Sequence, residues 1–113
     1  MLDRLRGWTA FDGGALLDDV AAALDDVPPP EEDTEEIAGR LRGHLGRLVT
    51  IAVATEAEQD AAAARLIEHA RTLRADDLPG DYRKAVGHLR RMGWIVNELL
   101  DRLVAVRCLK EVA

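Results

Sequence analysis

The side chains that could support acid–base or metal chemistry are three histidines, His44, His69 and His88, and one cysteine, Cys108. No two histidines are four residues apart, and no Glu-x-x-His pair occurs, so the sequence lacks the local ligand pairs typical of metal sites on helices. A lone cysteine can form neither an intrachain disulfide nor a cysteine-based zinc site. We therefore predict no metal and no cofactor. His44 and His88 could still meet across two helices in a metal site, but hydrogen-bonded structural histidines are favoured. Either His44 or His88 could also be the polar anchor of a pocket.

No arrangement of residues in the sequence is typical of catalysis. The chain contains no serine, and the glycine pair at 13–14 is not followed by the Lys-Ser/Thr of a phosphate-binding loop. No histidine lies near Cys108 in the sequence, which favours a small packing residue over a nucleophile. The pairs Asp18-Asp19 and Asp25-Asp26 are expected on a solvated helix face. We predict no catalytic residues and a protein that is not an enzyme.

Basic residues are the other candidates for binding chemistry. Residues 1–39 hold eleven acids and two bases, a net charge of −9, whereas residues 40–113 hold ten acids and thirteen bases, a net charge of +3. Arginines at seven-residue spacing could form a stripe for phosphate or nucleic acid, or they could pair with the acidic N-terminal part. The overall charge of −6 and the lack of a DNA-binding motif argue against nucleic acid. The candidate anion-binding residues are Arg40, Arg47, Arg83, Arg90 and Arg91.

Four helices must position these side chains. Apolar residues recur at helical spacing over 15–27, 34–54, 56–75 and 81–113. In the first three segments the expected inward positions are Leu16, Leu17, Val20, Ala23, Leu24, Ile37, Leu41, Leu45, Leu48, Val49, Ile51, Ala52, Ala63, Leu66, Ile67, Ala70 and Leu73. Three prolines at 28–30 end the first segment, and Pro79-Gly80 ends the third. A capping box at Thr55 and Glu58 indicates a break there, although nothing in the sequence forbids one continuous helix. We predict an all-α single domain, a four-helix antiparallel bundle with a long C-terminal helix and a flexible segment at 1–12.

Five glycines lie inside the predicted helices, at positions 39, 43, 46, 87 and 93. Each costs roughly 1 kcal/mol relative to alanine, so a compensating contact is expected. Gly43 and Gly46 lie one turn apart, which favours close packing of another helix of the same chain; a ligand or partner backbone is the alternative.

The predicted C-terminal helix has a continuous apolar stripe. About 30 residues would give a rod of roughly 45 Å, longer than the core of a small domain. A projecting apolar helix is usually covered by a second chain, so we predict a homodimer. The expected interface residues are Trp94, Val96, Leu99, Leu103, Val106 and Leu109.

The composition indicates the cellular compartment of the protein and the kind of genome that encodes it. No apolar run approaches the ~18 residues of a membrane span, and the charged N-terminus does not fit a signal peptide. We therefore expect a cytoplasmic protein without membrane contact. Thirteen arginines against two lysines, with abundant alanine, are typical of a GC-rich, actinobacterial genome.

Four segments carry a resemblance to known proteins: ALLDDVAAALDD at 15–26, LRGHLGRLV at 41–49, EHARTLRADDLPG at 68–80 and AVGHLRRMGWIVNELLDRL at 85–103. In these segments the chain resembles a family of small actinobacterial helical proteins of unknown function, labelled by association as natural-product biosynthesis proteins. The resemblance implies a small helical fold and brings no catalytic residues.

The sequence thus favours a non-catalytic helical adaptor or regulator that associates with itself, or with another protein, through its C-terminal helix. The alternatives are a small-molecule-binding bundle anchored by His44 or His88, and, less favoured, a nucleic-acid-binding protein with an arginine-rich face.

Overall fold

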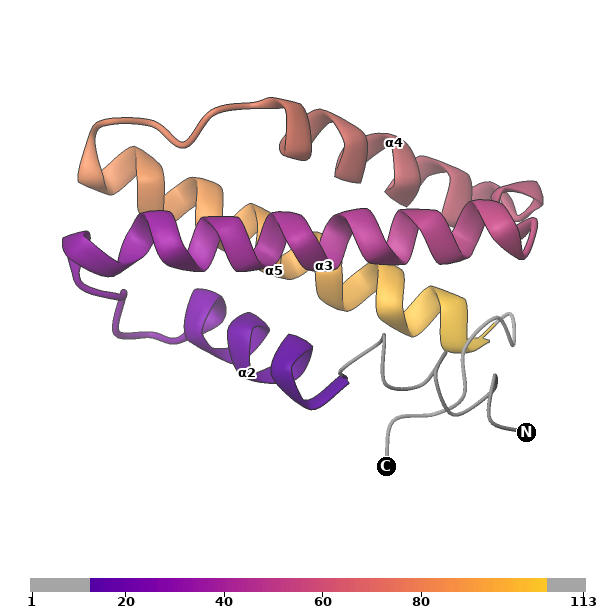
Figure 1. The fold of residues 1–113 in the computed structure, drawn as a ribbon, viewed down its shortest axis with the longest axis horizontal. Helices are drawn as coiled ribbons and strands as arrows, with labels where there is room; N and C mark the ends of the chain where they lie inside the picture. The colour runs from indigo at the N-terminus through magenta and orange to yellow at the C-terminus, as the bar shows by residue number, and fades with distance from the viewer. Residues whose placement is uncertain (1–12, 106–113) are drawn as a thin grey trace.

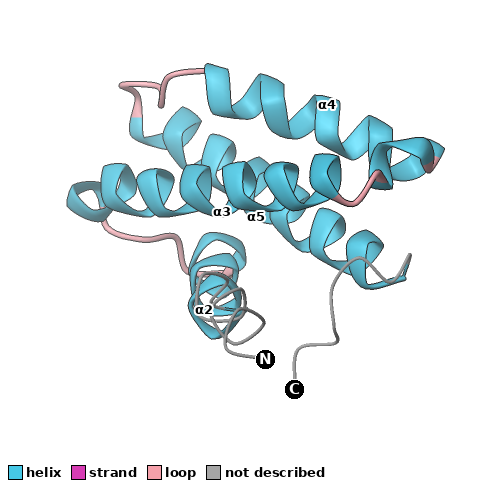
Figure 2. Ribbon diagram, turned by 45° about the vertical axis from the view of Figure 1, so that its right-hand side comes forward, coloured by secondary structure: helices cyan, strands magenta, loops and turns pink. Residues whose placement is uncertain are grey.

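The computed structural model describes residues 13–105, which are all-α with no strand within that range (Figure 2). Alanine and leucine, which favour helix, occur in each helical segment. The Pro28-Pro30 run separates the first helix from the second, and Pro79-Gly80 separates the third from the fourth. The elements are α2 (Gly13–Leu24), η1 (Glu31–Asp33), α3 (Thr34–Ala54), η2 (Ala57–Gln59), α4 (Ala61–Ala75) and α5 (Tyr82–Ala105). The prediction of an all-α fold with four helices is confirmed.

Successive helices run in opposite directions, so α3 and α5 point the same way and cross at the centre (Figure 1). Helix α5 packs against α2, α3 and α4. Helices α2 and α4 lie on opposite sides of the α3–α5 pair (Figures 1 and 2). The two central helices therefore carry most of the core. One flank of α4 faces α3, and the other flank faces α5.

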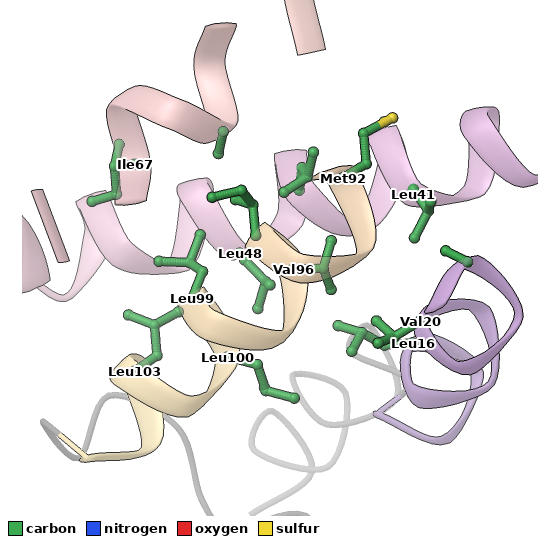
Figure 3. Packing of buried hydrophobic residues seen from close by; sticks show 14 of the residues in the cluster. Leu16, Val20, Leu41, Leu48, Ile67, Met92, Val96, Leu99, Leu100 and Leu103 are labelled. Atoms are coloured by element: carbon green, nitrogen blue, oxygen red, sulfur yellow. The ribbon is translucent and has the colours of Figure 1, made fainter. Parts of the chain in front are cut away.

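The core forms from the apolar stripes expected at helical spacing (Figure 3). Leu41, Leu45 and Leu48 of α3 are fully buried, and so are Leu89 and Met92 of α5. The expected inward positions Val49, Ile51, Leu66 and Leu73 are only partly buried. Leu17 and Leu24 were expected inside, but they are 41% and 38% exposed. Because α2 is short and packs on one side, only one of its faces is covered.

The break between α3 and α4 exists, but α4 begins later than predicted. The predicted capping box is wrong, because Thr55 ends α3 and its hydroxyl donates to the Ile51 carbonyl at 2.7 Å. Glu56 then adopts a left-handed backbone with φ of 60°. The true cap is Asp60, whose carboxylate accepts the Ala63 amide at 2.9 Å. A local capping pattern alone could not separate these two candidates.

The expected interface face of α5 proves to be the core of this chain. Val96, Leu99 and Leu103 have 0% exposure, because α5 is enclosed by the three other helices. They are therefore unavailable to a second chain in this fold. Trp94 is the exception, with 51% of its surface exposed. Val106 and Leu109 lie outside the described residues.

The described helices also stay within the body of the molecule. The 24 residues of α5 span about 36 Å, less than the longest molecular extent of 44 Å.

Across residues 13–105, none of the helices is both long and apolar enough to cross a bilayer.

Helix α2 is held close to α5 by a glycine and by the loop that follows. A Cβ built on Gly93 would lie only 2.9 Å from the Ala23 Cβ, so the two backbones approach closely there. The Tyr82 hydroxyl donates to the Pro29 carbonyl at 2.6 Å and fixes the proline segment against the start of α5. These contacts set the position of Leu24 beside Trp94.

Candidate functional site

An open apolar groove runs between α4 and α5 on the flank of α4 that faces away from α3. It has two lobes of about 640 Å³ and 550 Å³, and both are lined by His69 and Trp94. Leu66 lines the first lobe, and Leu73 and Ile95 line the second. We call this feature the Trp94 groove. Its size and its mainly apolar lining make it the candidate binding site.

The groove exists because α4 carries two apolar stripes. Ala63, Ile67 and Ala70 form the buried stripe that packs into the core. Ala62, Leu66 and Leu73 lie on a neighbouring stripe and line the groove instead. On α5, Trp94 follows the buried Gly93, and one step along a helix turns the side chain about 100° away from its neighbour.

Charged side chains at the rim of the groove are mainly basic. Arg65 lines the first lobe, and Arg90 and Arg91 line the second. The one acid in the lining, Glu68, already pairs with Arg71 at 3.1 Å. Arg90 donates to the Asp25 carbonyl at 3.0 Å, which holds its guanidinium near the C-terminal end of α2. The groove therefore presents an apolar floor inside a cationic rim.

The five arginines predicted to bind an anion do not form one stripe. Arg40 is bound to Asp19 at 2.9 Å and to Glu36 at 2.6 Å, which is the internal pairing that the sequence left open. Arg90 and Arg91 belong to the Trp94 groove. Arg83 is exposed in the first turn of α5 and lines neither lobe. Arg47 lies on α3, in a separate pocket.

His44 and His88, each a candidate polar anchor of a pocket, occupy different environments. The Nε2 of His44 lies 2.7 Å from a carboxylate oxygen of Asp19, on α2. Neither histidine lines the Trp94 groove. His69, which was not among the predicted pocket anchors, is the histidine at the groove.

Asp19 was expected to face water, but it is only 8% exposed. One oxygen accepts from Arg40 and the other meets His44, so the buried carboxylate is satisfied at both oxygens. Its spacing from Leu16 and Ala23, three and four residues away, places it on the inward face of α2. That spacing was available in the sequence, whereas the paired-acid pattern favoured the solvated face.

His88 is the least satisfied polar group of the described residues. It is 3% exposed, and its Nε2 has no hydrogen-bond partner there. Burial lowers the pKa of His88 below its usual 6.5, and the nearby positive charges of Arg91 and Arg42 lower it further, while Asp76 opposes them. His88 is therefore held in the neutral form. His88 is buried within the helical bundle and lines neither lobe of the Trp94 groove.

Within residues 13–105 no group of three His, Cys, Asp or Glu side chains is arranged to hold a metal ion. The Trp94 groove offers apolar contact and guanidinium donors. The chemistry of the Trp94 groove therefore suits apolar or anionic groups.

The fold and the groove define a class: a small all-α protein with an open apolar groove on a four-helix bundle. Residues 14–108 match a family of unknown function (DUF6415), and the chain belongs to that family. No curated protein and no solved structure matches the chain.

Proposed function

We propose that this protein is a non-catalytic interaction protein whose Trp94 groove binds an amphipathic helix of a partner protein. The observation that carries the proposal is Trp94 itself, half-exposed where the two apolar lobes meet. Tryptophan is among the residues most enriched at the energetic centres of protein interfaces. A partner that covers the exposed half of Trp94 would remove apolar surface from water, which favours binding.

The shape of the groove favours an extended apolar occupant. Its two lobes share Trp94 and His69, so they form one elongated surface along α4 and α5. An amphipathic helix places anchors at every third or fourth residue and fits such a groove between helices. The aliphatic side chains of Leu66 and Leu73 on α4 would contact those anchors.

The charge of the rim favours an acidic partner. Arg65, Arg90 and Arg91 surround the groove, and the only acid in its lining is already paired. Complementary charges steer association and select against basic partners. A helix with apolar anchors flanked by glutamate or aspartate therefore fits best.

The setting of this interaction is also part of the proposal. The resemblance seen in the sequence supports a setting beside natural-product biosynthesis in an actinobacterium, and the composition supports a cytoplasmic location. The role of adaptor or regulator rests on the Trp94 groove alone. Self-association, the arrangement favoured by the sequence, could not use Val96, Leu99 and Leu103 in this fold, because all three are buried. Trp94 is the expected interface residue that stays exposed in the described part of α5.

The test uses two synthetic amphipathic peptides with the same leucine face, one with glutamates and the other with lysines on the polar face. The chain has two tryptophans, so a Trp8→Phe background leaves Trp94 as the sole tryptophan emitter. We expect the acidic peptide to shift Trp94 emission and to bind at least about tenfold more tightly than the basic one. Calorimetry on the unmodified chain gives the affinities independently of fluorescence.

Trp94→Ala is the variant that removes the anchor, and Leu17→Ala is its matched control. Leu17 is a similarly exposed apolar side chain on α2 and does not line the groove. We expect Trp94→Ala to abolish peptide binding and Leu17→Ala to leave it unchanged. Equal binding of both peptides, or binding that survives Trp94→Ala, would rule out the proposal.

A second candidate is a small apolar anion in the lobe lined by Leu24, Leu73 and Arg91. Its volume of about 550 Å³ is within the ~300–1,000 Å³ of small-molecule sites. In that case the polar anchors would be Arg90 and Arg91 in place of the expected His44 or His88. Decanoate would then raise the melting temperature while decanol would not, and neither peptide would bind.

A further inference from the structure

The other flank of α4, toward α3, holds a second and chemically different pocket. It has a volume of about 420 Å³ and is lined by Gly43, Gly46, Arg47 and Thr50 of α3 and by Arg74 of α4. None of these residues is acidic, although the chain has 21 acidic residues. Two guanidinium groups therefore share an open pocket without a carboxylate in its lining.

Neither arginine side chain is paired within the described residues. Arg40, Arg71 and Arg102 are each bound to a carboxylate. The guanidinium groups of Arg47 and Arg74, by contrast, have no hydrogen bond or ion pair with any residue of the described range. Two cations in one pocket repel each other, and an anion between them would remove that repulsion.

The glycines of α3 give the pocket its floor. The Arg74 guanidinium lies over Gly46, with its Cζ 2.8 Å from where a Cβ would stand. At Gly43 a Cβ would meet nothing within 4 Å, so the space there is open. The Thr50 hydroxyl donates to the Gly46 carbonyl at 2.9 Å, which leaves the guanidinium N–H groups as the side-chain donors of the pocket.

We propose that Arg47 and Arg74 form a binding site for a phosphate-type oxyanion, either free phosphate or a phosphate monoester. Guanidinium groups match the tetrahedral oxyanion through paired N–H donors, and two of them can clamp it from adjacent helices. The glycine floor lets the anion approach the α3 backbone where a side chain at position 43 would intrude. The site lies apart from the Trp94 groove and does not depend on the function proposed there.

The experiment is a titration with inorganic phosphate at constant ionic strength, followed by NMR at the Gly43 and Gly46 amides and by calorimetry. We expect saturable shifts at these two glycines, with chloride at equal ionic strength giving none. Arg47→Gln and Arg74→Gln should each weaken phosphate binding by about tenfold. Arg83→Gln, an exposed arginine outside the pocket, should bind phosphate like the unmodified chain.

The melting temperature without phosphate separates binding from structure. Because neither guanidinium group has a polar partner among the described residues, substitution of Arg47 or Arg74 should leave the melting temperature without phosphate unchanged. Phosphate should raise the melting temperature only in chains that keep both arginines. If the site binds both glucose-6-phosphate and inorganic phosphate, it is assigned to a phosphate monoester. If it binds inorganic phosphate alone, it is assigned to the free anion. Phosphate binding that is equal in all variants overturns the proposal. So does tight, salt-sensitive binding of duplex DNA through the same arginines without phosphate binding.

Discussion

At the residue scale, the buried polar groups of this protein differ sharply in how well they are satisfied. Asp19 is enclosed at the junction of α2 and α3, and both of its oxygens have partners in α3. His88 is enclosed on α5, and its Nε2 has none among the described residues. An unpaired buried polar atom costs about 1–3 kcal/mol relative to its hydrated state. His88 is therefore a point at which the folded state is sensitive to solution conditions.

The first prediction concerns pH and His88. Its pKa is lowered in the folded chain from 6.5, so below that pH the unfolded chain binds the proton more readily and stability falls as pH decreases. Above about pH 7 both states hold neutral imidazole, and the effect vanishes. We expect His88→Leu to flatten the stability profile between pH 7 and 5, measured by urea denaturation. His69→Gln, at an exposed histidine, should keep the profile of the unmodified chain, and an unchanged slope in His88→Leu would contradict this account.

At the element scale, the glycines inside helices have different structural roles. Gly93 lets α2 pack closely on α5, and Gly46 lies under Arg74. At Gly39 and Gly43, a Cβ would meet nothing within 4 Å, so neither glycine makes such a contact. The expectation of a close helix approach at Gly43 is therefore not met, and Gly93 is where two helix backbones come together.

The second prediction follows from that contrast. Gly93→Ala would place a Cβ 2.9 Å from that of Ala23 and force α2 away from α5, with an expected loss of about 1–3 kcal/mol. Gly39→Ala meets no obstacle and should stabilise the chain by about 0.5–1 kcal/mol. Urea denaturation of both variants provides the measurement. Stabilisation by both substitutions would show that α2 does not dock on α5 as described.

The start of α4 is fixed by a contact between elements far apart in the sequence. Asp60 caps α4 and forms two bonds with Arg102 of α5, at 2.6 Å and 2.7 Å. The Arg102 bonds, followed by the Ala63 amide, lower the pKa of Asp60 from 3.8 to about 2. One side chain thus both begins a helix and ties it to α5.

The third prediction is a loss of heat and acid resistance when this link is removed. The folded-state stability from Asp60 is present above pH 3.8 and is lost as pH falls toward about 2, because the unfolded carboxyl is protonated first. Asp60→Ala should lower the melting temperature at pH 7 by several degrees and reduce that acid dependence. Asp101→Ala, at an exposed acid beside Arg102, serves as control. Equal melting temperatures for the two variants would contradict a structural link.

Helical spacing predicted the elements well because the inward positions follow one local periodicity. Leu41, Leu45 and Leu48 were placed correctly from spacing alone. The link between Asp60 and Arg102 spans 42 residues, and local patterns carry no information on such contacts. The Trp94 groove was missed for a related reason: Leu66 and Leu73 fit an inward face, and only the packing of α4 decides which of its two apolar stripes is covered.

At the scale of the whole molecule, α5 is the helix that every other helix covers. Its apolar stripe was interpreted from the sequence as an intermolecular surface, because periodicity cannot distinguish a core face from an interface face. With α2, α3 and α4 around it, the stripe is buried inside the chain, and the exposed Trp94 lies on a different side of the helix. The face of α5 that forms the core is therefore not the face on which Trp94 lies, and the proposed interaction uses the second of these faces.

The fourth prediction separates those faces with two acidic substitutions on the same helix. Leu103→Asp would place a carboxylate in a fully buried site and should cost more than about 4 kcal/mol, enough to unfold much of the chain. Trp94→Glu exchanges a half-exposed side chain and should leave the circular dichroism spectrum intact while removing binding at the groove. Thermal unfolding with light scattering across a concentration series measures both effects. If Leu103→Asp instead kept its fold and changed only the molecular mass, the stripe would be an intermolecular surface and the core assignment of α5 would be wrong.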